Sequence, residues 1–206
     1  MPIYSFPNGK TRINILSVHI PKTGGTSIGQ FFKSVGFSEH FGVEHQVIRP
    51  QMICPPQHYD YDILTRLFNL DLFHYSFAIV RHPIKRMISD YKWAMTKSTL
   101  PGKNMSFSDW FELSISLYNK NQYFLANHIK PQAFFVGPKI KRIFNYEDGL
   151  DNIMSMVFSD LGLVSSKPFL IPNVNVSSAL SVDITKADES KIRKFYVKDF
   201  ELFGYD

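Results

Sequence analysis

The feature that most constrains the fold of this chain is a short segment in which an apolar run meets a glycine-bearing turn and then an amphipathic run. Residues Ile13 to His19 are mostly apolar and β-branched, which predicts a strand. Pro21 to Ser27 favour a turn, and Ile28 to Val35 carry apolar side chains at helical spacing, with Gly36 as the stop. A strand that passes through such a turn into a helix is a common phosphate-binding arrangement. The segment therefore predicts an α/β protein with an anion site at the start of the helix.

The residues of this turn are suited to holding phosphate. Backbone N–H groups at a helix start lack partners, and the helix dipole favours an anion there. The two glycines let the backbone approach a ligand, the lysine adds a cation, and the hydroxyls add donors. The lysine precedes the glycines, so this is not a Walker A loop. A plain tight connection with a solvated lysine is the alternative explanation. The residues that we expect at the anion are Lys22, Thr23, Gly24, Gly25, Thr26 and Ser27.

A second anion site is predicted after the continuous apolar run Phe77 to Val80, which is typical of a buried parallel strand. The strand delivers Arg81 to its carboxyl end, where open parallel sheets bind ligands. Pro83 favours the first turn of a helix that extends to about Lys97. Ser89 lies on the helical face that leads back to Arg81, so both side chains are candidates for one anion. Alone, this pair favours a structural role, in which Arg81 binds a carbonyl or an acid and Ser89 only packs. A ligand with two separated phosphates explains both motifs together.

The other predicted elements alternate between strand and helix. Further helices are expected at Tyr61–Leu70, with Asp60 as the cap, and at Ser106–Leu117, Leu150–Leu161 and Asp188–Val197. Further strands are expected at Ala133–Val136 and Arg142–Tyr146, a short one within Gly42–Pro56, and an extended surface segment at Ser165–Val182. The inner face of the helix after Pro83 is expected to carry Ile84, Ile88, Tyr91 and Met95. We predict an α/β fold in a single domain over residues 1–206, a parallel sheet flanked by helices around a P-loop-like nucleotide-binding core.

Charge and cysteine content narrow the class of partner and compartment. The 206 residues include 23 Lys and Arg against 18 Asp and Glu, a net charge of +5 that favours an anionic ligand. No run of five like charges is present, so we expect no nucleic-acid partner. Cys54 is the only cysteine, which excludes an intrachain disulfide and favours a reducing compartment. With no signal peptide or apolar run of about 20 residues, we expect a cytoplasmic protein without a transmembrane segment. The oligomeric state is not indicated.

The two phosphate motifs together resemble those of a known family, the carbohydrate-type sulfotransferases. The segment His19 to Ser27 resembles their 5′-phosphosulfate loop, and Arg81 to Ser89, followed by Asp90-Tyr91, resembles their 3′-phosphate motif. Looser similarities follow in the family's order at Asn127–Gln132, at Tyr146–Asp148 and at Tyr196–Tyr205. The similarity touches most of the chain.

The resemblance implies a function and a set of ligands. It implies that 3′-phosphoadenosine 5′-phosphosulfate (PAPS) donates a sulfuryl group to a hydroxyl, most simply on a carbohydrate, and that 3′-phosphoadenosine 5′-phosphate (PAP) is the product. Lys22 to Ser27 would hold the 5′-phosphosulfate, and Arg81 and Ser89 the 3′-phosphate. Lys22 would also stabilise charge on the leaving oxygen. Golgi members of the family carry a membrane anchor, whereas we expect none in this chain.

Transfer to a hydroxyl calls for a general base, and we predict His58 in this role. It lies between the two phosphate motifs, after the stiffening pair Pro55-Pro56, and the family has a histidine base in a comparable segment. A surface-loop histidine without catalytic role explains the residue equally well. His128 is the second candidate for the base, also through the resemblance. No metal-ligand motif is found, so none is expected to be required.

Two other functions fit parts of the same pattern. A nucleotide-dependent phosphotransferase would require a Gly-Lys-Ser/Thr loop and an acidic Mg²⁺ ligand after a strand, whereas the second strand leads into Arg81. A non-catalytic module that binds an anionic glycan or nucleotide would have the same basic crevice but no base. Replacement of His58, with turnover and nucleotide binding measured separately, distinguishes them.

Overall fold

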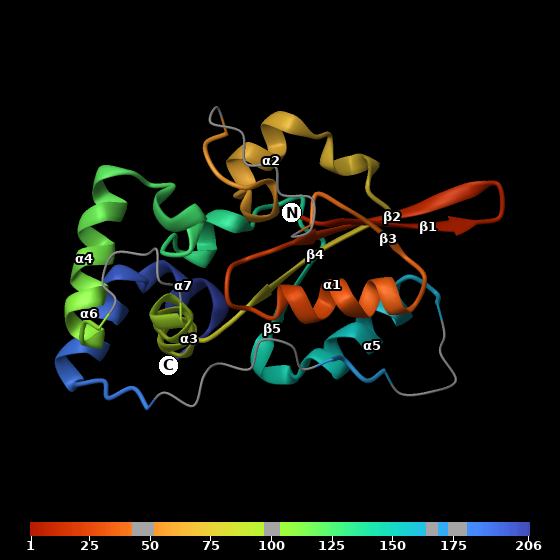
Figure 1. Ribbon diagram of the computed structural model, residues 1–206. Coiled ribbons are helices and arrows are strands. Elements are labelled where there is room, and N and C mark those ends of the chain that lie inside the picture. Colours follow the sequence, from red (N-terminus) through yellow and green to blue (C-terminus); the bar gives the residue numbers. More distant parts are fainter. Residues whose placement is uncertain (43–51, 97–103, 164–168, 173–180) are drawn as a thin grey trace.

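A mixed five-stranded sheet runs through this computed structural model, which describes residues 1–42, 52–96, 104–163, 169–172 and 181–206 (Figure 1). The strands are β1 (Ile3–Asn8), β2 (Thr11–Val18), β3 (Ser38–His40), β4 (Tyr75–Val80) and β5 (Arg142–Asn145). Their order in the sheet is β3-β1-β2-β4-β5. β2, β4 and β5 are parallel, whereas β1 and β3 are antiparallel to their neighbours. The predicted α/β class is confirmed, and the sheet is mixed rather than wholly parallel.

The two strands that carry the phosphate motifs are direct neighbours. β2 and β4 pair in parallel register, with Ile15 opposite Tyr75 and Val18 opposite Ala78. All six residues of β4 are buried, as the continuous apolar run predicts. Because parallel strands end at the same edge, the loops after β2 and β4 emerge side by side. The strands before the two motifs are therefore adjacent.

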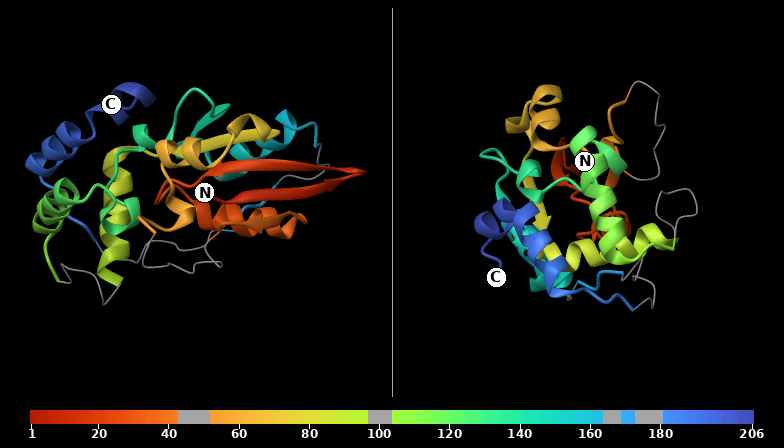
Figure 2. Two further views of the ribbon diagram at one scale, coloured as in Figure 1. Left: turned by 90° about the horizontal axis from the view of Figure 1, so that it is seen from above. Right: turned by 90° about the vertical axis from the view of Figure 1, so that its left-hand side faces the viewer.

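The hairpin of β1 and β2 was not predicted. Asn8 pairs with Thr11, so the connection is a two-residue turn in which Gly9 adopts a φ of 60°. Glycine at the first position of a two-residue turn between strand-like runs is a hairpin signal, because glycine tolerates the positive φ that this position requires. Figure 2 shows this hairpin projecting from the end of the molecule opposite to helices α4 and α6.

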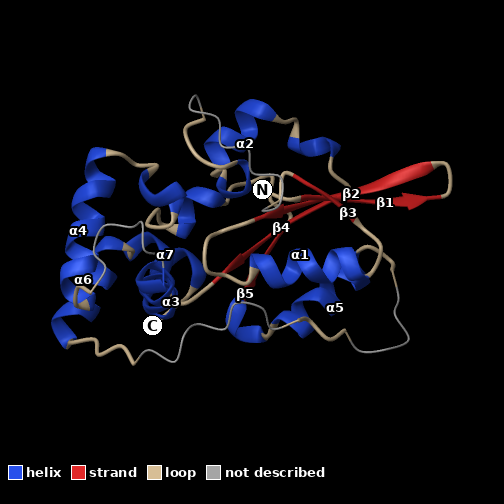
Figure 3. Ribbon diagram, viewed as in Figure 1, coloured by secondary structure: helices blue, strands red, loops and turns tan. Residues whose placement is uncertain are grey.

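The helices form two groups (Figure 3). Helices α1 (Gly25–Ser34) and α5 (Leu150–Asp160) pack on one sheet face, where Phe31, Phe32 and Phe158 join the apolar core. Helix α2 (Tyr61–Leu67) covers the other face, and Asp60 caps it by accepting a hydrogen bond from the Ile63 amide, as predicted. The second group lies beyond the carboxyl ends of β2 and β4 and has its own apolar cluster around Trp110. It consists of α3 (Pro83–Thr96), α4 (Phe107–Lys120), α6 (Lys186–Phe195) and α7 (Val197–Phe203).

Two local predictions are wrong. The segment Ala133–Val136 is not a strand: a 3₁₀ turn occupies Gln132–Phe135, and Asp199 accepts hydrogen bonds from the first two of its amides. The buried carboxylate replaces the partner strand that these residues would otherwise need. The inner face of α3 is also partly different from the expected one: Tyr91 is buried as predicted, but Met87 and Ala94 are buried as well, whereas Ile84 is only half-buried. The buried Arg86 and Asp90 belong to the same inner face, and a purely apolar template misses them.

Some predictions fall partly or wholly outside the described residues. Residues 43–51, within Gly42–Pro56, and residues 165–168 and 173–180, within Ser165–Val182, are among those that the structure does not describe. Within the described ranges, no helix has both the length and the apolar character needed to cross a bilayer.

Candidate functional site

The loop between β2 and α1 has the shape of an anion cradle. Gly24 caps α1 in the left-handed conformation, with a φ of 87°. Its carbonyl accepts from the Ile28 amide, so the amides of the three residues between have no acceptor within the helix. Lys22 also has a positive φ, 70°, which is uncommon for a residue with a side chain. The helix start, its dipole and the lysine therefore lie within one turn of chain.

The glycines of this loop are required by protein packing. A Cβ at Gly25 would lie 2.3 Å from His19 Nε2, and one at Gly24 would lie 2.9 Å from a methyl group of Leu150. At Gly25 a side chain would require the His19 ring to shift, and at Gly24 the φ of 87° itself disfavours a side chain, so both positions favour glycine even without a ligand. His19 thus shapes the loop by packing its ring against the helix start.

The hydroxyls of the loop are placed differently from one another. Thr23 is buried, and its hydroxyl donates to the Ile20 carbonyl at 2.9 Å, which closes the loop on itself. Ser27 is buried in the first turn of α1, whereas Thr26 is half-buried. Thr23 therefore has a structural contact here, and ligand contacts by these three residues remain predictions.

Arg81 joins the second motif to the first. Its Nη1 donates to the Lys22 carbonyl at 3.2 Å, and its guanidinium lies 4.5 Å from the centre of the Tyr146 ring. Its Nε is buried and has no hydrogen-bond partner among the described residues. Gln132 holds the Arg81 backbone through both its N–H and its carbonyl. Burial lowers the pKa of Arg81, and an arginine nevertheless stays protonated, so the site keeps a cation with an unmet donor.

The start of α3 is closed by acidic and aromatic side chains. Glu147 accepts from the His82 amide at 3.1 Å and from the Tyr205 hydroxyl at 3.0 Å. The His82 ring lies 5.3 Å from that of Tyr205, so the last residues of the chain cover this helix start. Ser89 is buried two turns further into α3, and its role at a 3′-phosphate remains a prediction.

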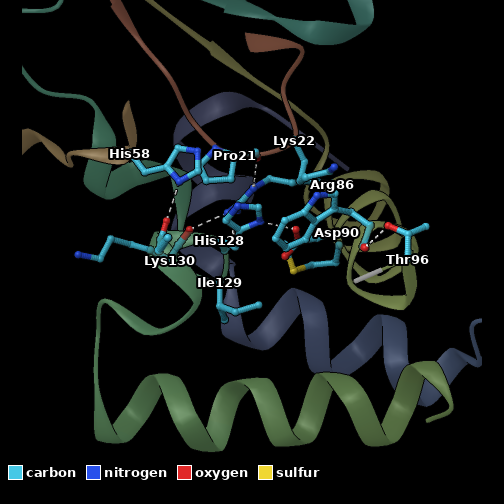
Figure 4. A network of polar contacts seen from close by, with 12 residues as sticks. Pro21, Lys22, His58, Arg86, Asp90, Thr96, His128, Ile129 and Lys130 are labelled. Atoms are coloured by element: carbon cyan, nitrogen blue, oxygen red, sulfur yellow. Dashed lines mark hydrogen bonds and ion pairs between the residues drawn. The ribbon is translucent and has the colours of Figure 1, made fainter. Parts of the chain in front are cut away.

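Three imidazoles gather beside the loop. The ring centres of His19 and His58 lie 5.1 Å apart, as do those of His58 and His128. All three side chains are buried. Figure 4 shows His58 and His128 beside Pro21 and Lys22. The structure thus brings both predicted base candidates to the predicted phosphate loop.

The tautomer of His58 follows from its partners. Its Nδ1 lies 2.9 Å from the Ala126 carbonyl, which can only accept, so Nδ1 carries the hydrogen. Its Nε2 lies 3.2 Å from the amide nitrogen of Gln57 and accepts from it. Burial, followed by the charges of His128 and His19, lowers the pKa of His58 well below its usual value. The ring is therefore neutral at physiological pH.

The segment that holds His58 is conformationally strained. Leu125, Ala126 and Asn127 all have positive φ, between 53° and 67°, and none of them is glycine. Such residues cost on the order of 1–3 kcal/mol each and persist where surrounding contacts fix them. Asn127 supplies one contact, since its amide donates to the His58 carbonyl at 2.9 Å. Strain of this kind clusters at functional sites.

His128 is paired with a carboxylate. Its Nδ1 lies 2.6 Å from Asp90 Oδ1, and Asp90 is fully buried on α3. The His128 ring stacks on the Trp93 indole, with centres 4.5 Å apart, and Lys22 Nζ lies 5.6 Å from a ring centre of the same indole. Trp93 therefore spans from the phosphate loop to His128.

One buried guanidinium ties these parts together. Arg86, at 0% exposure, donates to the carbonyls of Pro21, His128 and Lys130 (Figure 4). It thereby fixes Pro21, the residue before Lys22, relative to the segment that carries His128. Asp90, Trp93 and Arg86 had no predicted role. Charged residues four apart on the inner face of an amphipathic helix are the signal by which Arg86 and Asp90 could have been found.

The fold and this site define a class: an α/β protein with a P-loop-like anion cradle, a second basic site at the next parallel strand and imidazoles beside them. The comparison with family models then gives the family. The model described as the sulfotransferase family matches residues 9–206, so the chain belongs to that family. Sulfuryl transfer is the family's chemistry, which makes the chain a transferase. No curated protein and no solved structure matches the chain.

Proposed function

We propose that this chain is a PAPS-dependent sulfotransferase that acts on a hydroxyl of a carbohydrate acceptor, as one domain over residues 1–206, in the cytoplasm. The observation that carries the proposal is the contact of Arg81 with the Lys22 carbonyl, next to a buried Arg81 Nε without a partner among the described residues. Two cationic motifs that meet in this way suit a nucleotide with phosphates at both its 5′ and 3′ positions.

The residues at the site fit such a donor. The amides and hydroxyls from Thr23 to Ser27, with Lys22, would hold the 5′-phosphosulfate, and Arg81 and Ser89 the 3′-phosphate. A bound PAPS would supply an activated sulfuryl group with PAP as its leaving group. Lys22 and the helix start would stabilise the negative charge that develops on the leaving oxygen, as preorganised donors do. Arg86 would hold the loop that carries Lys22 at a fixed position relative to the imidazoles.

The acceptor hydroxyl must lose a proton during transfer, and the imidazoles beside Lys22 are suited to take it. His58 is the residue that the sequence predicts, and its depressed pKa would keep it neutral and able to accept. His128 is the alternative. Either would act without a metal ion.

Isothermal titration with PAP, AMP and ATP tests this function most directly. We expect PAP to bind at least about tenfold more tightly than AMP, because only PAP offers a 3′-phosphate to Arg81. Equal affinities would contradict the proposal, and a preference for ATP with Mg²⁺ would favour a phosphotransferase. Tight PAP binding without PAP release from PAPS, in the presence of a panel of mono- and disaccharides, would favour a non-catalytic binding module.

A further inference from the structure

His58 and His128 differ in whether protein groups bind both ring nitrogens or only one of them. Both ring nitrogens of His58 have a protein partner. Nδ1 donates to the Ala126 carbonyl, and Nε2 accepts from the side-chain amide of Gln57. The Gln57 amide already occupies the lone pair on Nε2. An acceptor hydroxyl would have to displace Gln57, a buried side chain, to reach His58.

His128 has the opposite arrangement. The Asp90 carboxylate accepts from Nδ1–H at 2.6 Å, which leaves the lone pair on Nε2. Within the described part of the chain, Nε2 has no hydrogen bond and does not belong to the buried side-chain atoms without partners. No described protein group therefore occupies its lone pair, and the ring as a whole is 7% exposed.

We propose that His128 takes the acceptor proton and that Asp90 is its positioning residue, a proposal that rests on the sulfuryl transfer proposed above. His128 Nε2 forms its new N–H bond as the acceptor O–H bond breaks. The electron pair of that O–H bond enters the new O–S bond, and the pair of the breaking S–O bond leaves with the phosphate beside Lys22. The imidazolium that results is balanced by Asp90, whose second oxygen, Oδ2, is also buried and has no partner among the described residues.

The surroundings of His128 support this assignment of roles. The charged or titratable groups that face it are Asp90 and Arg86 from α3, His58 from the turn before α2, and His19 and Lys22 from the phosphate loop. Asp90 is the acid among them, and it lies against Nδ1 rather than Nε2. Stacking on Trp93 fixes the plane of the ring, and Lys22 lies against the same indole. The proton acceptor and the cation at the leaving oxygen are thus held by one side chain.

The tautomer can be measured without any activity. A ¹⁵N-histidine NMR spectrum of the intact chain, with His128→Gln to assign the signals, should show neutral His128 with its hydrogen on Nδ1. Asp90→Asn should weaken this preference, while the signals of His58 should keep theirs. A His128 that carries its hydrogen on Nε2 would overturn the proposal.

Turnover of a matched pair of variants gives the second test. With PAPS and the sugar panel, PAP release should fall roughly 10²–10⁴-fold in His128→Ala and less than about tenfold in His58→Ala, since only one residue is the base. PAP affinity should be unchanged in both, and added imidazole should restore turnover in His128→Ala alone. The reverse ranking would assign the base to His58. A parent chain that fails to bind PAP would instead contradict the proposed function, and the tautomer measurement would still decide the state of His128.

Discussion

The anion-binding side of the site and the histidine side are built in different ways. On the anion side, Lys22 to Ser27 are consecutive, and Arg81 directly follows the strand paired with β2. On the histidine side, His19, His58 and His128 come from three separate segments, and Asp90 comes from a fourth. The first side is built mainly from consecutive residues and one strand pairing, with Arg86 and Gln132 holding its backbone from outside. The second needs the whole helical group to pack.

This difference has consequences for energetics. Arg81 remains charged across physiological pH, and the proposed function of the anion side depends on donors that point at a ligand. The histidine side is buried, and its rings are held by carbonyl, amide and carboxylate partners. Substitutions on the anion side should therefore alter ligand binding and turnover, whereas conditions that charge the imidazoles should alter stability.

The largest effect is expected at Lys22. Lys22→Ala removes the cation that we propose at the leaving oxygen, and turnover of PAPS should fall roughly 10²–10³-fold, as for the loss of one preorganised donor. Lys85→Ala is the matched control, because Lys85 is exposed on α3 within the second motif. Steady-state PAP release measures both. A Lys22→Ala chain that keeps more than half of the parental turnover would contradict this role.

A smaller effect is expected at Arg81. Arg81→Ala removes a charge-assisted hydrogen bond to phosphate, worth roughly 1.5–3 kcal/mol, so PAP should bind at least about tenfold more weakly. AMP affinity should change little, which separates the 3′-phosphate from the rest of the nucleotide. Arg142→Ala, at an exposed position of β5, is the control. Calorimetry that finds an equal loss for PAP and AMP would remove Arg81 from the 3′-phosphate site.

The histidine side should make stability depend on pH. Burial lowers the pKa of His19 to about 3 and that of His58 well below 6.5. Between these values and 6.5, the unfolded chain binds more protons than the folded one, so stability is lost as the pH falls below about 6.5. Each histidine should contribute about 1.4 kcal/mol of loss at one pH unit below its unfolded pKa.

Urea unfolding at pH 7.5 and 5.5 measures this loss. His19→Gln should reduce the difference between the two pH values, whatever its effect on the stability at pH 7.5. His74→Gln, at an exposed position, should leave that difference unchanged. The expectation for His19 is wrong if both variants retain the full parental dependence.

The smallest effect is expected in the strained segment. Ala126 has a φ of 53°, which costs a non-glycine residue roughly 1–2 kcal/mol. Ala126→Gly should relieve that strain and raise stability by up to about 1 kcal/mol after the entropy cost of glycine. Ala187→Gly, in the ordinary helical conformation of α6, should instead lower stability. Thermal unfolding compares the two, and a lower melting temperature for Ala126→Gly would exclude stored strain there.

Much of the anion side could be predicted because its signals are local. The apolar run before Pro21 and the turn residues after it define the strand and the helix start, and the apolar run before Arg81 defines a buried strand. The hairpin of β1 and β2 was missed, although Gly9 between two strand-like runs is a local signal for it. The segment Ala133–Val136 was predicted as a strand because apolar, aromatic residues suit a sheet equally well. Its actual turn depends on Asp199, far along the chain.

The sequence by itself therefore determined the α/β class, the strand–turn–helix segment around Lys22 and the position of Arg81 after a buried strand, because each rests on residues close in sequence. Only the tertiary structure decided which imidazole has a ring nitrogen without a partner among the described residues. That difference depends on Asp90 at His128, and on Ala126 and Gln57 at His58. Neither Asp90 nor Ala126 lies within 30 positions of the histidine that it contacts, and hydrogen-bond partners at such separations are set by packing of the whole chain, not by local preference.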